Sequence, residues 1–381
     1  MKNRDFIIFG EDFARHPHAL EHLMRPLFAS NRFIWVETIG LRSPHFSLYD
    51  LRRIGEKIKS WIFNSKTQKI NPEHIHVVSP FMIPLNQFKI VRKFNQWSVL
   101  RSVRKVAEQL QFKDIISISS VPNAADYVGH FNEVTKIYYC VDEFSLWPGL
   151  NYDLVSSLEK KLLTKVDFIT ATSDQLSQSK VLKDKTTTTI THGVDFEHFS
   201  IPEKTTLSKV KICYFGLFDE RSDQDIILKM ALDHQDCEIH LFGNVVCPVS
   251  KLEKCQNITF HGSVSYAELP AKIIDMDIFF LPYTETDLTR FINPLKLKEY
   301  LCTGRPVVAT PLPEVIKLKE YLSIATTPDD FSAFINLYKN KSRSFDRMKI
   351  LNYIKQNETW QVKSQMMVKL IEDFERSRQS K

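Results

Sequence analysis

The fold of this chain is decided by the stretch Asn293-Pro294-Leu295-Lys296-Leu297-Lys298-Glu299-Tyr300-Leu301, which runs into Gly304-Arg305-Pro306-Val307-Val308-Ala309-Thr310. Asn293 is a favourable N-cap, and Pro294 suits the first helical position because its missing N–H would be unpaired there anyway. Leu297 and Leu301 lie four residues apart and give the helix a buried stripe, whereas Lys296 lies on another face. The stretch therefore predicts a helix followed by a buried strand.

The start of this helix carries the groups that a nucleotide diphosphate needs. The N–H groups in the first turn of a helix have no partner within the helix, and together with a lysine they attract phosphate. Lys296 supplies the charge, and one turn further on the carboxylate of Glu299 can accept hydrogen bonds from a ribose diol. We expect the ligand to be bound by Asn293, Pro294, Leu295, Lys296 and Glu299.

The same residues resemble a known family. Residues 286–301 with 304–310 are similar to the donor-binding signature of bacterial GT-B glycosyltransferases, above all the family 4-like enzymes of teichuronic-acid and exopolysaccharide biosynthesis. The xanthan glucuronosyltransferase is a more distant likeness. Residues 139–144 also fit, and residues 191–199 are similar to the "NGVD…F" segment before the interdomain linker. The resemblance extends over about residues 4–370 and is most specific in the second half.

The resemblance implies a fold, an activity and a location. The fold would be α/β of the GT-B type, with two Rossmann-like domains whose parallel sheets face a cleft. The activity would be transfer of a sugar from a nucleotide-diphospho sugar, most simply a UDP-sugar, to a glycan or lipid-linked saccharide in bacterial surface-polysaccharide synthesis. Such enzymes stabilise the leaving diphosphate with a helix dipole and basic side chains, so we expect neither a metal nor another cofactor. The enzyme would act in the cytoplasm, either free or peripherally bound at the inner face of the cytoplasmic membrane.

Apolar strands alternate with amphipathic segments along the whole chain, a pattern typical of parallel sheets covered by helices on both faces. Predicted strands are 5–9, 33–37, 75–78, 115–119, 136–141, 168–171, 188–191, 211–215, 238–242, 258–260, 278–281 and 307–310. Predicted helices are 18–29, 153–163, 222–232, 266–276 and 294–301. The polar stretch 200–209 reads as a linker.

We therefore expect an acceptor-binding domain at 1–203 and a donor-binding domain at 204–356. The terminal segment 357–381 is helical in pattern. Its helix either crosses back to the first domain, as in GT-B enzymes, or lies on the surface of the second.

Composition fits a large globular protein without metal or disulfide signatures. The chain has 381 residues, of which 43% are hydrophobic and 25% charged. Its six cysteines form no CxxC pair and have no histidine at zinc spacing, so we expect reduced thiols. The N-terminus does not resemble a signal peptide, and no apolar run approaches the roughly 18 residues needed to cross a bilayer.

One segment is strongly basic. Residues 51–113 contain 13 lysines and arginines against three acidic residues, with large apolar side chains interleaved. Basic segments rich in Trp and Phe are attracted to anionic membrane surfaces. The alternative is a solvated helix face whose aromatic residues point into the core. Nucleic-acid binding is disfavoured because no recognition motif accompanies the charge.

Further donor-side candidates lie at strand ends. Gly216 follows the predicted strand 211–215, where a glycine lets backbone amides approach a phosphate. Arg221 follows closely and either clamps the diphosphate or merely opens a helix. Gly243 ends the next predicted strand. It either packs near the nucleotide base or forms a purely structural turn. The glycines do not form a GxGxxG fingerprint, so an NAD enzyme is disfavoured.

On the acceptor side, Asp142 follows the predicted strand 136–141 and could act as general base toward an acceptor hydroxyl. The alternative is an aspartate that only caps a loop. His16 is a second base candidate, together with His18, although His16-Pro17-His18 also reads as a helix N-terminus.

The sequence departs from one family pattern. Retaining enzymes with a Glu-x7-Glu motif carry a first glutamate eight residues before the second glutamate. Here the second would be Glu299, and the residue eight positions before it is Phe291. The stereochemical outcome therefore stays open. A non-hydrolysing sugar-nucleotide epimerase and a non-catalytic sugar-nucleotide-binding subunit remain as rival functions.

Overall fold

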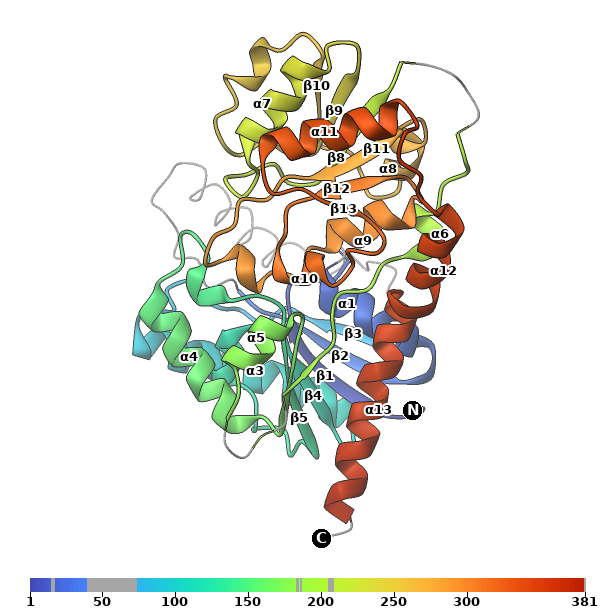
Figure 1. The fold of residues 1–381 in the computed structure, drawn as a ribbon. Helices are drawn as coiled ribbons and strands as arrows, with labels where there is room; N and C mark the ends of the chain where they lie inside the picture. Colours follow the sequence, from blue (N-terminus) through green and yellow to red (C-terminus); the bar gives the residue numbers. More distant parts are fainter. Residues whose placement is uncertain (15–17, 40–73, 183–184, 186, 205–208, 380–381) are drawn as a thin grey trace. The chain divides into compact units, whose positions relative to one another are not determined.

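The computed structural model describes residues 1–381 except 15–17, 40–73, 183–184, 186, 205–208 and 380–381. The chain divides into two compact units, one formed by Met1–Thr191 with Ser364–Lys381 and the other by His192–Lys363. Each unit contains its own sheet, and every strand pair in both sheets is parallel (Figure 1). The predicted α/β class with two parallel sheets is confirmed.

The first unit has a seven-stranded sheet in the order β3-β2-β1-β4-β5-β6-β7. Its strands are β1 (Asp5–Gly10), β2 (Arg32–Glu37), β3 (Ile75–Val78), β4 (Ile116–Ser119), β5 (Thr135–Cys140), β6 (Phe168–Ala171) and β7 (Thr187–Thr189). The order reverses between β1 and β4, and ligands of such sheets bind beyond the carboxyl ends of the strands near that point. β1 is buried along its whole length because five of its six residues are apolar or Gly.

Helices cover both faces of this sheet. They are α1 (Ala19–Met24), α3 (Lys89–Gln109), α4 (Tyr152–Lys165) and α5 (Asp174–Ser179), with short 3-10 helices at Arg25–Ser30, Pro122–Asp126 and Phe144–Leu146. The starts of α4 and α5 follow from capping: Asn151 accepts from the N–H of Leu154, and Ser173 accepts from the N–H of Leu176. None of the helices in the described part of the chain has the length and apolarity to span a membrane.

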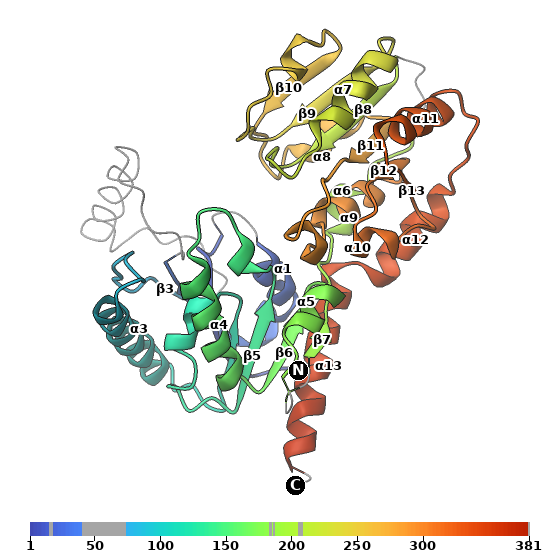
Figure 2. The same ribbon diagram turned by 60° about the vertical axis from the view of Figure 1, so that its left-hand side comes forward.

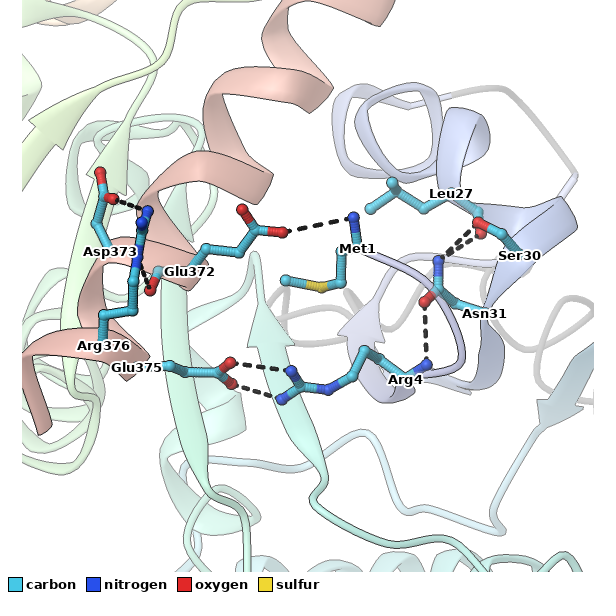
Figure 3. Close-up of polar contacts among 9 residues, drawn as sticks. All are labelled: Met1, Arg4, Leu27, Ser30, Asn31, Glu372, Asp373, Glu375 and Arg376. Atoms are coloured by element: carbon cyan, nitrogen blue, oxygen red, sulfur yellow. Dashed lines mark hydrogen bonds and ion pairs between the residues drawn. The ribbon is translucent and has the colours of Figure 1, made fainter. Parts of the chain in front are cut away.

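The terminal helix α13 (Trp360–Gln379) completes the first unit from residue 364 onward. Figure 3 shows Glu375 making a two-pronged ion pair with Arg4, with N···O distances of 2.5 and 2.9 Å. Glu372 lies 3.5 Å from the amino group of Met1. Phe374 packs on Phe168 of β6 with ring centroids 5.4 Å apart. The last helix is therefore part of the same core as the first strand.

The second unit has a six-stranded sheet in the order β10-β9-β8-β11-β12-β13. Its strands are β8 (Lys211–Phe215), β9 (Glu238–Phe242), β10 (Ile258–Gly262), β11 (Ile278–Leu281), β12 (Val307–Ala309) and β13 (Ser323–Ile324). Its helices are α6 (Phe196–Phe199), α7 (Gln224–Asp233), α8 (Leu269–Ile273), α9 (Leu295–Cys302), α10 (Pro313–Ile316), α11 (Pro328–Lys339) and α12 (Arg347–Asn357), with 3-10 turns at Leu252–Lys254 and Thr289–Phe291. Here the order reverses between β8 and β11.

The boundary between the units lies at 191/192, ahead of the position near residue 203 expected from composition. The apolar residues between these positions explain the difference. Val194 and Phe199 are buried in the core of the second unit, where Phe199 stacks on Phe215 with ring centroids 5.8 Å apart. The thiol of Cys302 in α9 also contacts the carbonyl of Phe196 at 3.4 Å. All six cysteines carry free thiols.

Candidate functional site

The strand-order reversal of the second unit brings Gly216 and Lys296 together. Gly216 follows β8 and has φ +129°, a conformation that an L side chain rarely adopts. A Cβ at this position would lie 1.9 Å from Cε of Lys296, so the lysine side chain occupies the space directly beside the glycine. Gly243 after β9 packs just as closely, because its Cβ would lie 2.0 Å from the carbonyl oxygen of Gly216. The three predicted donor residues therefore share one end of the sheet.

Two tyrosines that the sequence analysis missed surround the Lys296 ammonium. Its Nζ donates to the Tyr214 hydroxyl at 2.7 Å and to the carbonyl of Leu217 at 3.0 Å. It lies 4.7 Å from the ring centroid of Tyr214 and 5.5 Å from that of Tyr283. Burial alone would lower the pKa of Lys296, but Tyr283 and Tyr214 outweigh it and the pKa is raised. The lysine therefore carries a full charge at neutral pH.

Arg221 adds a second cation at the same place. Its guanidinium forms a bidentate pair with Asp219, with an Nη2–Oδ2 distance of 2.6 Å, and lies 5.7 Å from the Tyr283 ring centroid. Burial lowers the pKa of Arg221, but the hydrogen bonds to Asp219 raise it by more, so the pKa lies above its ordinary value. Tyr283 thus contacts both Arg221 and Lys296. Arg221 is not the exposed helix-opening arginine of the alternative interpretation.

The helix start itself differs from the expectation. α9 begins at Leu295 and its N-cap is Pro294, so the predicted N-cap role of Asn293 is wrong. The Asn293 amide instead donates to Oε2 of Glu314 at 3.2 Å, because the side chain turns inward toward α10. Its Oδ1 is buried and has no hydrogen-bond partner within the part of the chain that the structure describes. Among the described residues, no side chain caps the first turn of α9.

Glu299 is partly buried on α9, one turn beyond Lys296. Burial raises its pKa to about 7, and the nearby Lys296 only partly offsets this. A raised carboxyl pKa means that the neutral form is favoured in the free protein. The contribution of this carboxyl to folding stability is therefore fully present below its ordinary pKa of 4.5. That contribution is lost as the pH rises through about 7. Such a carboxyl would gain from a ligand that donates hydrogen bonds to it.

Lys298, beside Glu299, is a structural residue that the sequence analysis also missed. Its Nζ pairs with Oε2 of Glu358 at 2.6 Å and donates to the carbonyl of His192. Lys363 contacts the same Glu358 oxygen at 2.9 Å. Desolvation lowers the pKa of Lys298 to about 8. The contacts of Lys298 with Glu358 and with the His192 carbonyl hold α9 against the two segments, near 192 and 358, at which the chain enters and leaves the second unit.

In the first unit, Asp142 lies two residues after β5, at the carboxyl edge of the sheet, and is partly exposed. Its neighbour Glu143 turns inward, where Lys180 bridges Glu143 and Glu159 at 2.6 and 2.7 Å. The Tyr138 hydroxyl also donates to Glu159, at 2.8 Å. This buried network fixes the loop that carries Asp142.

The histidine candidates have different outcomes. His16 lies outside the described residues. His18 is the N-cap residue of α1, and its ring lies 5.4 Å from the ring of Trp35. Burial lowers the pKa of His18, so the ring is neutral at pH 7, and its buried Nε2 has no hydrogen-bond partner among the described residues. The neutral imidazole is the form that a general base requires before it takes a proton.

One group of possible metal ligands lies elsewhere, at the opposite end of the second sheet. His234, Asp236 and Cys237 place one ligand atom each within 4.8 Å of one another, just before β9. Their polar groups already have partners: His234 Nε2 contacts Ser332 at 3.0 Å, and Lys339 pairs with Asp236 at 2.7 Å. This group therefore belongs to the packing of α11 on the sheet.

Comparison with solved structures identifies the fold. Sucrose-phosphate synthase from Thermosynechococcus elongatus aligns with a TM-score of 0.71 at 11% identity, covering 98% of this chain and 100% of that one. Anabaena HepE in complex with UDP-glucose aligns with a TM-score of 0.66 at 13% identity, covering 97% and 99%. The chain therefore has the GT-B fold of glycosyltransferases, as predicted.

Sequence comparison then gives two matches. Residues 209–340 match the model of the glycosyl transferases group 1 family, and they include the donor-side residues described above. TuaH of Bacillus subtilis, a protein assigned as a teichuronic acid biosynthesis glycosyltransferase, is 27% identical over 184 residues. That alignment covers 44% of this chain and 46% of TuaH, so the match spans about half the length of the curated relative. The predicted resemblance to this family is confirmed.

Proposed function

We propose that this chain is a glycosyltransferase that moves a sugar from a UDP-sugar to a glycan or lipid-linked saccharide in bacterial surface-polysaccharide synthesis. The observation that carries the proposal is the match of residues 209–340 to group 1 glycosyl transferases, with two cations, Lys296 and Arg221, placed at the strand-order reversal of that unit. A site of this kind attracts a diphosphate. HepE, with the same fold, is solved with UDP-glucose, and TuaH is assigned to teichuronic acid biosynthesis.

Each candidate residue then has a defined part. The second unit binds the donor, with Gly216 and the start of α9 at the diphosphate and Gly243 toward the base. Lys296 and Arg221 neutralise the departing diphosphate, and Glu299 accepts from the ribose hydroxyls. The first unit binds the acceptor, whose hydroxyl Asp142 deprotonates. No step of this scheme calls on a metal. The reaction would take place in the cytoplasm, where nucleotide sugars are the donors.

A direct test measures donor binding and turnover on the purified protein. UDP and UDP-sugars should raise the melting temperature, whereas GDP-, CMP- and dTDP-sugars should do so less. With the bound UDP-sugar, slow release of UDP in the absence of an acceptor is expected. Stabilisation by UDP without any UDP release or transfer would favour a non-catalytic subunit, and formation of an epimeric UDP-sugar would favour an epimerase.

Glu299 gives a prediction that depends on pH. Glu299→Ala should weaken UDP binding at pH 8 by about 1.5–3 kcal/mol, the range for a hydrogen bond to a charged group. Because only the ionised carboxylate accepts from both ribose hydroxyls, UDP affinity of the wild type should rise between pH 6 and pH 8, through the Glu299 pKa of about 7. At pH 6 about one tenth of the Glu299 carboxyl is ionised, so the UDP affinity at pH 8 should exceed that at pH 6 by about tenfold.

Glu299→Gln is the control for this experiment, because UDP has phosphate groups that also titrate near pH 6. Calorimetry on both proteins separates the two effects: the pH dependence that remains in the variant belongs to UDP. If wild type and Glu299→Gln show the same pH dependence and the same affinity at pH 8, Glu299 does not contact the ribose.

A further inference from the structure

Helix α3 carries a stripe of apolar side chains on its solvent side. Ile90, Phe94 and Trp97, with Arg101 in line after them, are spaced by four, three and four residues and so lie on one side of the helix. The apolar members are 83%, 37% and 55% exposed. Phe88, which precedes the helix, is 55% exposed. Figure 2 shows α3 along an outer face of the first unit.

The opposite side of α3 makes the contacts that hold the helix to its unit. Val99 and Val103 are fully buried. The Asn95 amide exchanges hydrogen bonds with the backbone of Ile83, at 2.8 and 2.9 Å. The exposed stripe is therefore additional to the packing face. The interpretation in which the aromatic residues of this segment point into the core is wrong for α3.

The stripe residues form a continuous aromatic surface with a cation at its end. Phe81 contacts Phe94 edge-on with centroids 6.1 Å apart, and Phe94 lies 5.9 Å from Trp97. The Arg101 guanidinium sits over the Trp97 ring at 5.5 Å. Side chains of this kind prefer the boundary between hydrocarbon and polar headgroups, where the ring is apolar and the charge reaches water.

Cations flank the stripe on both sides. Exposed positive charges on α3 are Lys89, Lys93, Arg101, Arg104 and Lys105, and the acidic residue of the helix is Glu108. Arg92 differs, because it turns toward the first unit and pairs with Asp126 at 3.1 Å. Two copies of the chain meeting through this face would set like charges against each other. An anionic lipid surface complements both the charge and the exposed aromatic rings.

We propose that the Ile90–Phe94–Trp97–Arg101 face of α3 docks this protein on an anionic bilayer surface. The aromatic side chains enter the headgroup region, and the flanking lysines and arginines contact lipid phosphates. This inference goes beyond the proposed function and stands on α3 alone. It is compatible with a lipid-linked acceptor, which would be held at the same surface.

The test uses the full chain and vesicle co-sedimentation. We expect binding to phosphatidylglycerol vesicles, little binding to phosphatidylcholine vesicles, and a steep loss as salt shortens the Debye length. The triple variant Lys93→Glu, Arg101→Glu, Lys105→Glu should bind on the order of 10²-fold more weakly, since each cation near the surface contributes about fivefold. The control reverses three exposed lysines of the second unit, Lys254, Lys272 and Lys319, and should bind like the wild type despite the same change in net charge.

A second variant separates insertion from charge attraction. Ile90→Ser, Phe94→Ser, Trp97→Ser keeps every cation and should also lose most binding, while Trp97 fluorescence of the wild type, taken against Trp97→Phe, should shift to the blue with anionic vesicles. UDP-induced stabilisation of all three triple variants checks their fold and is independent of lipid. Equal vesicle binding by wild type and charge-reversed protein, or no binding by the wild type, would overturn the proposal. A wild-type dimer in sedimentation velocity that the serine variant dissolves would assign the face to self-association instead.

Discussion

Asp142→Asn should leave donor binding intact and slow sugar transfer by about 10²–10⁴, the usual range for loss of a general base. Asparagine keeps the shape of the side chain but cannot take a proton from the acceptor hydroxyl. The loop should stay in place, because the adjacent Glu143 is held by Lys180 in the interior. Single-turnover transfer and UDP calorimetry on the same preparation measure the two quantities.

The control for this variant is Asp153→Asn, which removes an exposed carboxylate from the first turn of α4 in the same unit. It should behave like the wild type in both measurements. Transfer at a near wild-type rate by Asp142→Asn would place the base elsewhere. His18 would then be the next residue to replace, since its ring is neutral and its Nε2 has no hydrogen-bond partner in the described structure, followed by His16.

The second large effect is expected for Lys296→Ala, which should lower the rate of transfer by about 10²–10³ with a smaller loss of donor affinity. Negative charge grows on the diphosphate as the glycosidic bond breaks, so a cation there helps the transition state more than the bound donor. The loss should appear mainly in kcat. Tyr214 keeps its hydrogen bond to the carbonyl of Leu217, at 2.8 Å, so the site should not collapse.

Lys272→Ala, an exposed lysine on α8, is the matched control and should have no effect on kcat. The assignment fails if donor affinity and kcat/KM fall by the same factor while kcat is unchanged, because the lysine would then only add uniform binding. Melting curves of both variants show whether the fold is retained.

Most strands could be predicted from the sequence because they are short apolar runs between polar segments, and five of them match the structure at both ends, including 211–215 and 278–281. The two-residue strand β13 is too short to leave such a pattern. The omission of α11 is different, since Thr327, Pro328 and Asp330 form a capping box with proline in the first turn. That start signal was present in the sequence and would have located the helix.

The candidate site could be predicted only where its parts are close in the sequence. Lys296 and Glu299 could be proposed from the sequence because one helix start, that of α9, contains both. Tyr214 lies within β8 and Tyr283 lies two residues after β11, so the two tyrosines are far apart in the chain and resemble core residues. Only the sheet order brings them to one ammonium. The N-cap prediction for Asn293 was wrong because a tertiary contact with Glu314 outweighed the local preference.

The chain order of α13 has a consequence for how the protein is made. The ribosome completes residues 192–363 before it makes residues 364–381, yet these last residues belong to the unit that begins at residue 1. At about 5–20 residues per second, the first unit waits roughly 10–35 s for its last helix. During that time the surface later covered by Met367 and Ile371, both fully buried in the finished protein, is open to water. We therefore expect the first unit to expose an apolar surface until residues 364–381 have been translated.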